Sequence, residues 1–245
     1  MLELKNISLE INDYGEDDAI EILRNVNLRI DDESFIVITG PNGGGKSTLA
    51  KIIMGLQKPT NGKIIFNNED ITDLDITERA KKGIGFAFQQ PVRFKGLYVR
   101  DLLRLAAGRR LTTETACAYL AEVGLCAKNY IDREINASLS GGELKRIEIA
   151  MLIARRTKLS IFDEPEAGID LWSFHSLIRV FKKIRDTNKG TIVIISHQER
   201  ILDIADKIVV ISNGKVAAFG KKTEILPELL KDSDSCRFYR EEIQA

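Results

Sequence analysis

Alternating apolar and polar residues mark the start of the chain. Residues 2–11 (LELKNISLEI) and 21–30 (EILRNVNLRI) follow this pattern, and an acidic stretch, NDYGEDDA, separates them. A period of two gives a strand one apolar side and one polar side. We therefore predict two half-buried strands in an antiparallel layer at the N-terminus.

Continuous apolar runs predict strands of another kind. These runs occupy residues 35–40 (FIVITG), 159–163 (LSIFD) and 191–196 (TIVIIS). A strand that is apolar on both sides is typical of a parallel sheet with helices on both faces. Residues 207–220 (KIVVISNGKVAAFG) place Asn-Gly between two apolar runs, which predicts a β-hairpin.

A helical period appears in residues 142–156 (GELKRIEIAMLIARR). Ile147, Ala150, Met151 and Ala154 line one face of the helix that this spacing predicts. Strands that alternate with helices in this way indicate an α/β fold with a mainly parallel core sheet.

The distribution of these segments predicts one inserted lobe. Residues 90–155 hold no buried strand run, so we expect them to form a helical lobe. Residues 1–89 and 156–245 would then form the α/β core, which includes the N-terminal antiparallel layer. The charged tail after Gly220 is expected to add one or two helices on the surface.

Composition excludes several classes of protein. The chain has 245 residues and is 44% hydrophobic, which is enough for a large core. Lys plus Arg and Asp plus Glu both number 36, so the formal charge is zero and direct binding of nucleic acid is not expected. No apolar run approaches the ~20 residues that span a bilayer, and the N-terminus lacks the pattern of a signal peptide. We expect a cytoplasmic protein without direct membrane insertion.

The cysteines do not suggest a metal site. Cys117, Cys126 and Cys236 form no CxxC pair and no Cys/His spacing of the kind that binds zinc. We expect them to be reduced thiols.

A glycine-rich segment after the run at 35–40 has the spacing of a phosphate-binding loop. GPNGGGKST fits G-x-x-x-x-G-K-S and precedes a helical pattern, LAKIIMGL. Glycines allow backbone N–H groups to surround a phosphate, the lysine adds a positive charge, and the serine hydroxyl can bind Mg²⁺. The residues assigned to ATP are Gly40, Pro41, Asn42, Gly43, Gly44, Gly45, Lys46, Ser47 and Thr48. Such a loop alone also occurs in kinases, GTPases and helicases.

Two carboxylates end another buried run. In LSIFDEPEAGID, Asp163 and Glu164 follow a strand whose carboxyl end would lie beside the phosphate loop. Asp163 can hold Mg²⁺ through water, and Glu164 can orient or deprotonate the attacking water. His197 follows the run TIVIIS at the same edge of the sheet. His175 lies in a helical pattern without a partner motif, and we expect it to be a packing or surface residue.

A second helix start can bind an anion. In LSGGE, residues 139–143, Ser140 is a suitable N-cap and the glycines allow a close backbone approach. One ATP has only one γ-phosphate, so the economical arrangement is two chains head to tail. In that homodimer each chain offers its motif to the nucleotide of the other, through Ser140, Gly141, Gly142 and Glu143.

Taken in order, GPNGGGKST, Gln89, LSGGE, FDEPEAGID and His197 resemble the nucleotide-binding domain of ATP-binding cassette (ABC) ATPases over nearly the whole chain. The resemblance implies a P-loop NTPase fold of the ABC type that hydrolyses ATP with Mg²⁺ and dimerises on ATP. By this resemblance, the metal is bound by Ser47, Gln89 and Asp163. Glu164 is implied as the general base, and His197 and Gln89 as further catalytic residues. Residues 167–170, which include Asp170, would communicate across the dimer.

The chain departs from the family pattern at the adenine contact. Family members usually stack an aromatic residue on the base, whereas Ile11 occupies this position and Tyr14 is offset. The resemblance therefore defines ATP hydrolysis better than it defines selectivity for ATP over GTP.

Finer motifs are similar to the SufC-like cassette ATPases of SUF-type iron-sulfur cluster assembly. AFQQPVRFKG, SGGELKR and HQERIL carry this likeness, which implies a SufB- or SufD-like scaffold protein as partner. By the same resemblance Val92, Phe94, Leu97 and Tyr98, next to Gln89, would contact the partner. Each of the four is equally well explained as a core residue of the helical lobe.

The sequence also leaves a transport function open. DEPEAG has the DEP form of transporter subunits, and Leu139 replaces a phenylalanine that is frequent in the SUF group. The alternative is therefore the ATP-binding subunit of a membrane ABC transporter, with a permease as partner. The neutral net charge disfavours a third class, the cassette ATPases that act on nucleic acid.

Overall fold

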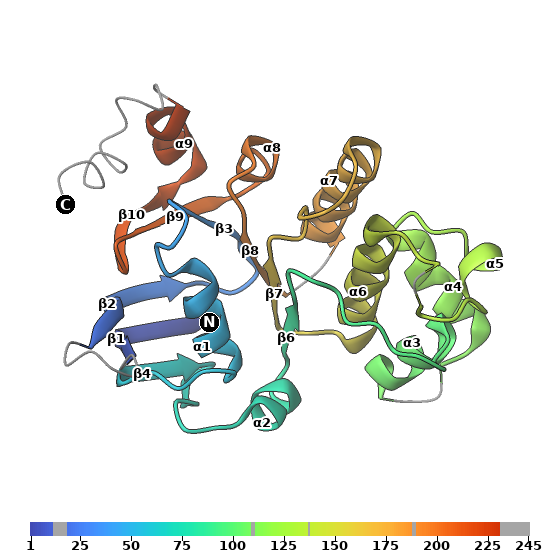
Figure 1. Ribbon diagram of the computed structural model, residues 1–245, viewed down its shortest axis with the longest axis horizontal. Helices are drawn as coiled ribbons and strands as arrows, with labels where there is room; N and C mark the ends of the chain where they lie inside the picture. The colour runs from blue at the N-terminus through green and yellow to red at the C-terminus, as the bar shows by residue number, and fades with distance from the viewer. Residues whose placement is uncertain (12–18, 109–110, 137, 188–189, 231–245) are drawn as a thin grey trace. The chain divides into compact units, whose positions relative to one another are not determined.

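Two compact units make up the chain in the computed structural model (Figure 1). The structure describes residues 1–11, 19–108, 111–136, 138–187 and 190–230. The first unit joins Met1–Lys82 to Thr191–Ala245, and the second is Gly83–Gly190.

An antiparallel sheet begins the first unit, with the strand order β2-β1-β4-β5. The bounds are Leu2–Ile11 for β1, Ile20–Ile30 for β2, Asn61–Phe66 for β4 and Glu69–Asp70 for β5. The alternation of β1 breaks at Asn6, whose φ is 53°, where the pairing with β2 shifts between Leu4 and Ile7. This bulge returns Ile7 to the buried side, so the strand keeps a continuous core face.

Parallel pairing surrounds β3, which runs from Phe35 to Thr39. This strand pairs with β8, Thr191–Ile195, and with β9, Lys207–Ser212. The predicted hairpin turns at Asn213 and Gly214, with φ of 48° and 73°, into β10, Lys215–Lys221. Every residue of β3 and β8 is buried, which confirms the interpretation of the continuous apolar runs.

The helices of the first unit include the one that follows the phosphate loop. Their bounds are Lys46–Met54 for α1, Ile76–Lys81 for α2, Glu199–Leu202 for α8 and Lys222–Leu230 for α9. Helix α1 contacts β2 and α2, and its residues Leu49, Ala50, Ile52 and Ile53 are at most 1% exposed. Helix α9 lies in the charged tail, where the sequence predicts surface helices.

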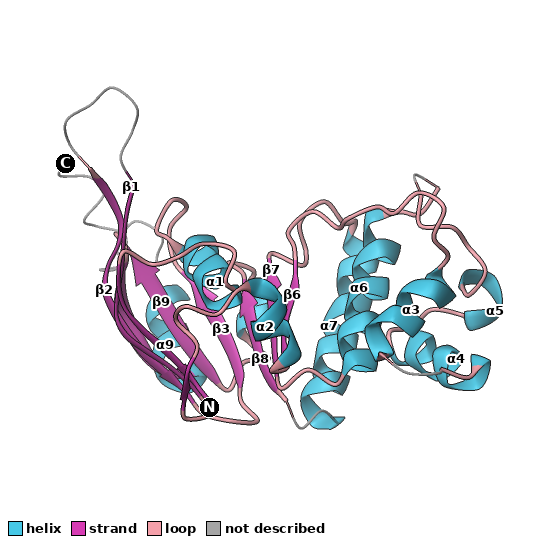
Figure 2. Ribbon diagram, turned by 90° about the horizontal axis from the view of Figure 1, so that it is seen from below, coloured by secondary structure: helices cyan, strands magenta, loops and turns pink. Residues whose placement is uncertain are grey.

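Four helices dominate the second unit, with a short one between them. The bounds are Val99–Ala107 for α3, Thr113–Glu122 for α4, Ala127–Tyr130 for α5, Gly141–Arg155 for α6 and Leu171–Thr187 for α7. Helix α6 contacts α3, α4 and α7, as Figure 2 shows. Ile147, Ala150 and Ala154 are buried on α6 as predicted, and Met151 is half-buried.

Two parallel strands complete the second unit. They are β6, Ile84–Ala87, and β7, Leu159–Asp163, and they pair from Ile84 with Leu159 to Ala87 with Phe162. Within residues 91–155, the described part of the chain forms only helices, loops and an isolated bridge between Tyr98 and Glu134. The predicted α/β fold, with parallel core strands, an antiparallel N-terminal sheet and a helical region, is therefore confirmed.

Some of the sequence predictions concern residues outside the described ranges. Tyr14, Cys236 and the end of the tail lie outside the described residues, while Cys117 and Cys126 are free thiols. Among the residues that the structure describes, no helix combines the length and the apolar composition that crossing a bilayer requires.

Arg79 on α2 fixes the far end of α1. Its guanidinium donates to the carbonyl oxygens of Ile52 at 2.6 Å and Ile53 at 2.9 Å in the last turn of α1. It also donates to the carbonyl oxygens of Leu74 at 2.9 Å and Thr72 at 2.8 Å. The side chain is 1% exposed, and burial lowers the pKa of the guanidinium. Arg79 thus supplies a donor to the carbonyl group of Ile53 at the end of α1, and a second donor to that of Ile52, which also accepts from the N–H of Gly55.

We expect Arg79→Met to lower the free energy of unfolding by about 3 kcal/mol, because the carbonyl groups of Ile53, Leu74 and Thr72 lose the donor that Arg79 gives them. Urea denaturation measures this loss. Lys81→Met is the matched control, since Lys81 lies on the same helix and is exposed, and its effect should stay within about 0.5 kcal/mol. Equal losses in the two variants would refute this role of Arg79.

Candidate nucleotide-binding and hydrolysis site

The loop between β3 and α1 requires glycine. Gly40, Gly43 and Gly45 have φ of 134°, 78° and 99°, a region that other residues rarely adopt. A Cβ on Gly40 would lie 1.9 Å from the carbonyl oxygen of Ile211 in β9. The loop therefore passes so close to the sheet that only glycine fits at this position.

Lys46 begins α1 and turns back over this loop. Its Nζ donates to the carbonyl oxygens of Gly40 at 2.8 Å and Pro41 at 2.5 Å, and the side chain is 6% exposed. Gly45 is the N-cap of α1 and makes no side-chain cap, and the first turn carries no acidic residue. A helix start of this kind, with a lysine beside it, presents N–H groups and positive charge to an anion. Ser47 and Thr48 follow and are half-buried.

Two further candidates lie in the first unit. His197 lies two residues after the end of β8 and is exposed, with its Nε2 3.4 Å from the Nε2 of Gln198. Ile11 is the last residue of β1 and is 41% exposed, so the position where the resemblance implies an aromatic residue presents an aliphatic side chain.

In the second unit, the ends of β6 and β7 bring Gln89 and Glu164 together. The Nε2 of Gln89 donates to Oε2 of Glu164 at 2.5 Å. Asp163, the last residue of β7, is buried with 5% exposure. Glu164 has a φ of 43°, a left-handed conformation that costs a non-glycine residue about 1 kcal/mol or more. The backbone at the end of β7 thus holds the Glu164 carboxylate in a strained position that faces Gln89.

The start of α6 packs closely on residues 168–173. A Cβ on Gly141 would lie 3.1 Å from the carbonyl oxygen of Gly168, and one on Gly142 would lie 2.7 Å from the Cβ of Ser173. Asp170 accepts from the backbone N–H groups of Trp172 at 2.9 Å and Ser173 at 3.0 Å. These bonds, led by that from Ser173, lower the pKa of Asp170. The structure therefore joins the two segments predicted to act in a dimer, LSGGE and residues 167–170, within one unit.

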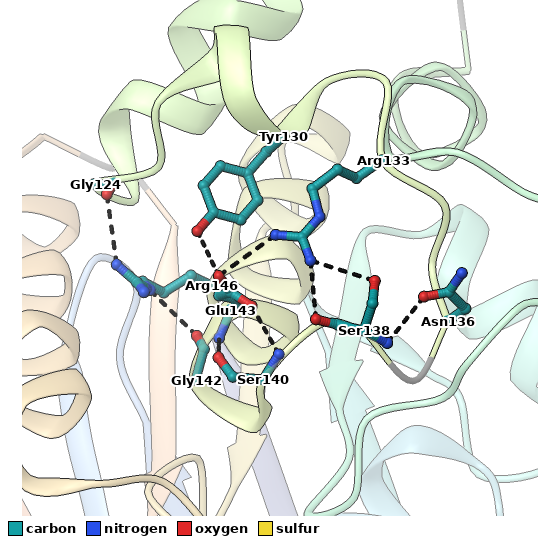
Figure 3. A network of polar contacts seen from close by, with 9 residues as sticks. All are labelled: Gly124, Tyr130, Arg133, Asn136, Ser138, Ser140, Gly142, Glu143 and Arg146. Atoms are coloured by element: carbon teal, nitrogen blue, oxygen red, sulfur yellow. Dashed lines mark hydrogen bonds and ion pairs between the residues drawn. The ribbon is translucent and has the colours of Figure 1, made fainter.

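Glu143 is held by its own chain (Figure 3). Its carboxylate accepts from the backbone N–H of Ser140 at 2.7 Å, and Ser140 Oγ accepts from the backbone N–H of Glu143 at 3.3 Å, which is a capping box. Tyr130 Oη donates to Oε1 of Glu143, and Arg133 lies 3.6 Å from the same oxygen. Burial raises the pKa of Glu143, but the bonds from Tyr130 and Ser140 outweigh it and leave the pKa low.

The sequence did not predict the roles of Tyr130 and Arg133. Arg133 also donates to the carbonyl oxygen of Ser138 at 2.9 Å, so it supports the segment that leads into α6 (Figure 3). Neither residue lies in a motif: Tyr130 is the last residue of α5, and Arg133 lies in the loop between α5 and α6. Together they fix the geometry of the helix start that LSGGE forms.

Comparisons with known proteins all point to the same family. Residues 23–167 match the family described as ABC transporter. An uncharacterized ABC transporter ATP-binding protein of Methanocaldococcus jannaschii is 40% identical over 225 residues, which cover 88% of this chain and 89% of that protein. A probable ATP-dependent transporter ycf16 of Pyropia yezoensis is 36% identical over 234 residues, with coverage of 88% and 92%. The energy-coupling factor transporter ATP-binding protein EcfA2 of Caldanaerobacter subterraneus is 34% identical, with coverage of 93% and 81%.

A solved structure has the same fold and a bound product. It is a dimeric ATP-binding cassette in a post-hydrolysis state with ADP and phosphate, with a TM-score of 0.80 and 28% identity, covering 91% of this chain and 99% of that one. The chain therefore belongs to the ABC transporter family as an ATP-binding cassette that hydrolyses ATP.

Proposed function

We propose that this ABC ATPase couples ATP hydrolysis to a conformational change in a SufB- or SufD-like scaffold protein during iron-sulfur cluster assembly. The observation that carries the coupling is the 2.5 Å hydrogen bond from Gln89 to Glu164. Gln89 belongs to a segment that continues, two residues later, into the wall of an apolar cavity at Pro91 and Val92. A partner seated in that cavity would act on the segment that holds the proposed general base.

The proposed chemistry divides into binding and hydrolysis. Lys46 and backbone N–H groups of the loop that follows Pro41, residues 42–48, bind the phosphates, and Glu164 deprotonates the attacking water, which Gln89 orients. His197 contacts the γ-phosphate. Bound Mg²⁺ would offset the negative charge of the phosphates.

The donor set fits that metal. Ser47 Oγ, the Asp163 carboxylate and the Gln89 side-chain amide offer oxygen atoms, the ligands that Mg²⁺ prefers. Asp163 is buried, so its carboxylate already sits in a site of low dielectric where a cation binds strongly.

A dimer that forms on ATP supplies the rest of the proposed site. ABC cassettes assemble in this way, and a similar cassette was solved as a dimer after hydrolysis. Ser140, Gly141 and Gly142 would meet the nucleotide of the second chain, while Glu143 acts indirectly because its carboxylate is already bound to Tyr130 and Ser140. Asp170, whose carboxylate orders the start of α7, would communicate between the two sites.

Sequence likeness supports the SUF-type partner. AFQQPVRFKG, SGGELKR and HQERIL carry it, and ycf16 proteins of the SufC type are among the relatives at 31% to 36% identity. The second candidate is the ATP-binding subunit of a membrane transporter with a permease as partner. The DEP form at Asp163 and the 34% identity to EcfA2 favour that candidate. In both cases we place the ATPase in the cytoplasm.

We expect Lys46→Ala to weaken MgATP binding by at least about a hundredfold, because it removes the cation that faces the phosphates. Isothermal titration calorimetry with MgATP measures the change. Lys51→Ala is the control, since Lys51 is exposed at the other end of α1 and its loss should leave affinity unchanged. Unchanged affinity in Lys46→Ala would contradict the phosphate-loop assignment.

We expect Glu164→Gln to lower kcat by about a thousandfold or more, while ATP still binds and the ATP-bound dimer persists. A glutamine keeps the size of the side chain but cannot accept the proton of water. The rate of phosphate release at saturating MgATP measures kcat, and size-exclusion chromatography with MgATP shows whether the dimer persists. Glu114→Gln, an exposed site on α4, is the control. Near-normal turnover in Glu164→Gln would exclude Glu164 as general base.

Partner capture separates the two candidate functions. Tagged Glu164→Gln protein, loaded with MgATP, is used to bind proteins from detergent-solubilised native extract, and mass spectrometry identifies them. We expect soluble SufB- or SufD-like proteins, with the same capture in MgADP as the control. Recovery of a multispanning protein in their place would support the transport function.

A further inference from the structure

An apolar cavity in the second unit contains one ionisable group. Its volume is about 160 Å³. Its lining residues are Phe86, Phe88, Pro91, Val92, Phe94, Leu102, Ile135, Leu144, Ile147, Glu148, Met151 and Leu152. Val92 is 48% exposed and Phe94 is 39% exposed, so large apolar surface borders the cavity. Glu148 is the one residue of this lining that can carry a charge.

The Glu148 carboxylate lacks part of its hydrogen bonding. Its side chain is 18% exposed, and its Oε2 is buried and accepts no hydrogen bond. The nearest cation is Lys145, whose Nζ is 3.9 Å from that oxygen and donates instead to the carbonyl oxygen of Phe88. Burial raises the pKa of Glu148 to about 7, although Lys145 and the backbone N–H of Val92 act in the other direction. A buried carboxyl group with an unused acceptor is costly unless a partner completes it.

Helix α6 holds both ends of the segment that carries Gln89. Lys145 donates to Phe88 before Gln89, and Glu148 accepts from the N–H of Val92 after it. The two residues are one helical turn apart on α6. A group that binds the Glu148 carboxylate therefore competes with the N–H of Val92 for that carboxylate. Val92 is three residues from Gln89, which contacts Glu164.

We propose that Glu148 accepts hydrogen bonds from a Lys or Arg side chain of the partner segment, whose apolar side chains occupy the cavity. The inference rests on the proposed function, because it assumes that this cavity receives the partner. A cation would donate a hydrogen bond to the buried Oε2, and the apolar surroundings would strengthen this ion pair. An acidic segment would be repelled, and a purely apolar segment would leave Oε2 without a donor. The partner chemistry that fits is thus an amphipathic segment with one basic residue among apolar ones.

Matched peptides test this recognition. The probe is a fluorescent amphipathic helix about 16 residues long, with leucines around a central arginine, and its control has citrulline, a neutral analogue, in place of the arginine. Fluorescence anisotropy with the wild-type protein should give binding of the arginine peptide about tenfold tighter than that of the citrulline peptide. In Glu148→Gln the preference should fall to about twofold or less, and Glu114→Gln should keep the wild-type preference.

A charge exchange provides a second test. Glu148→Lys should lose the arginine peptide and bind a peptide with a central glutamate, and if this variant does not fold, Glu148→Gln still decides. An arginine preference that survives in Glu148→Gln, or failure of both peptides to bind the wild type, would overturn the proposal. These results are independent of ATP turnover, so absence of hydrolysis in the wild type would count against the proposed function alone.

Discussion

The hydrogen bond between Gln89 and Glu164 is the contact on which the proposed coupling depends. It exists because β6 and β7 pair in parallel up to Ala87 and Phe162, so the residues that follow leave the sheet at the same edge. The left-handed φ of Glu164 then turns its carboxylate toward Gln89. A conformation of this energy persists only where the surrounding structure enforces it, and such positions concentrate at functional sites. In the proposed function, this bond joins the general base, Glu164, to the segment that the partner contacts.

Helix α6 gathers the other elements around this contact. Its first turn forms the LSGGE site, with Glu143 bound to Tyr130, and its second turn places Lys145 and Glu148 against the segment around Gln89. Because an α-helix is stiff over two turns, a displacement of α6 at Glu148 also moves Gly141 and Gly142, which pack on residues 168–173. The buried charges of Lys145 and Glu148 reduce stability compared with apolar residues of the same size. Their position between two segments to which we assign functions gives a reason for their presence.

Sequence patterns predicted the parts of the fold that depend on local periodicity. The apolar runs of β3, β7 and β8 and the Asn-Gly turn before β10 were found where the sequence placed them. The short strands β4 and β6 were missed, because six residues that begin with Asn-Gly and four that include a glycine give too little alternation to detect. The motifs also selected Gln89 and Glu164 separately. Their contact, like those of Tyr130, Arg133 and Arg79, depends on loops and helix packing that no local pattern encodes.

Specificity for the partner depends on a different kind of interaction from ATP hydrolysis. Apolar surface such as Val92 and Phe94 gives affinity but discriminates poorly, since many amphipathic segments can cover it. A single carboxylate in the same cavity discriminates between partner segments, because binding a segment without a cation leaves a buried acceptor unsatisfied and so costs free energy. That selection applies equally to a soluble scaffold and to a cytoplasmic loop of a permease. The charge at Glu148 therefore constrains which segment of a partner binds, while the identity of the partner follows from which protein presents such a segment.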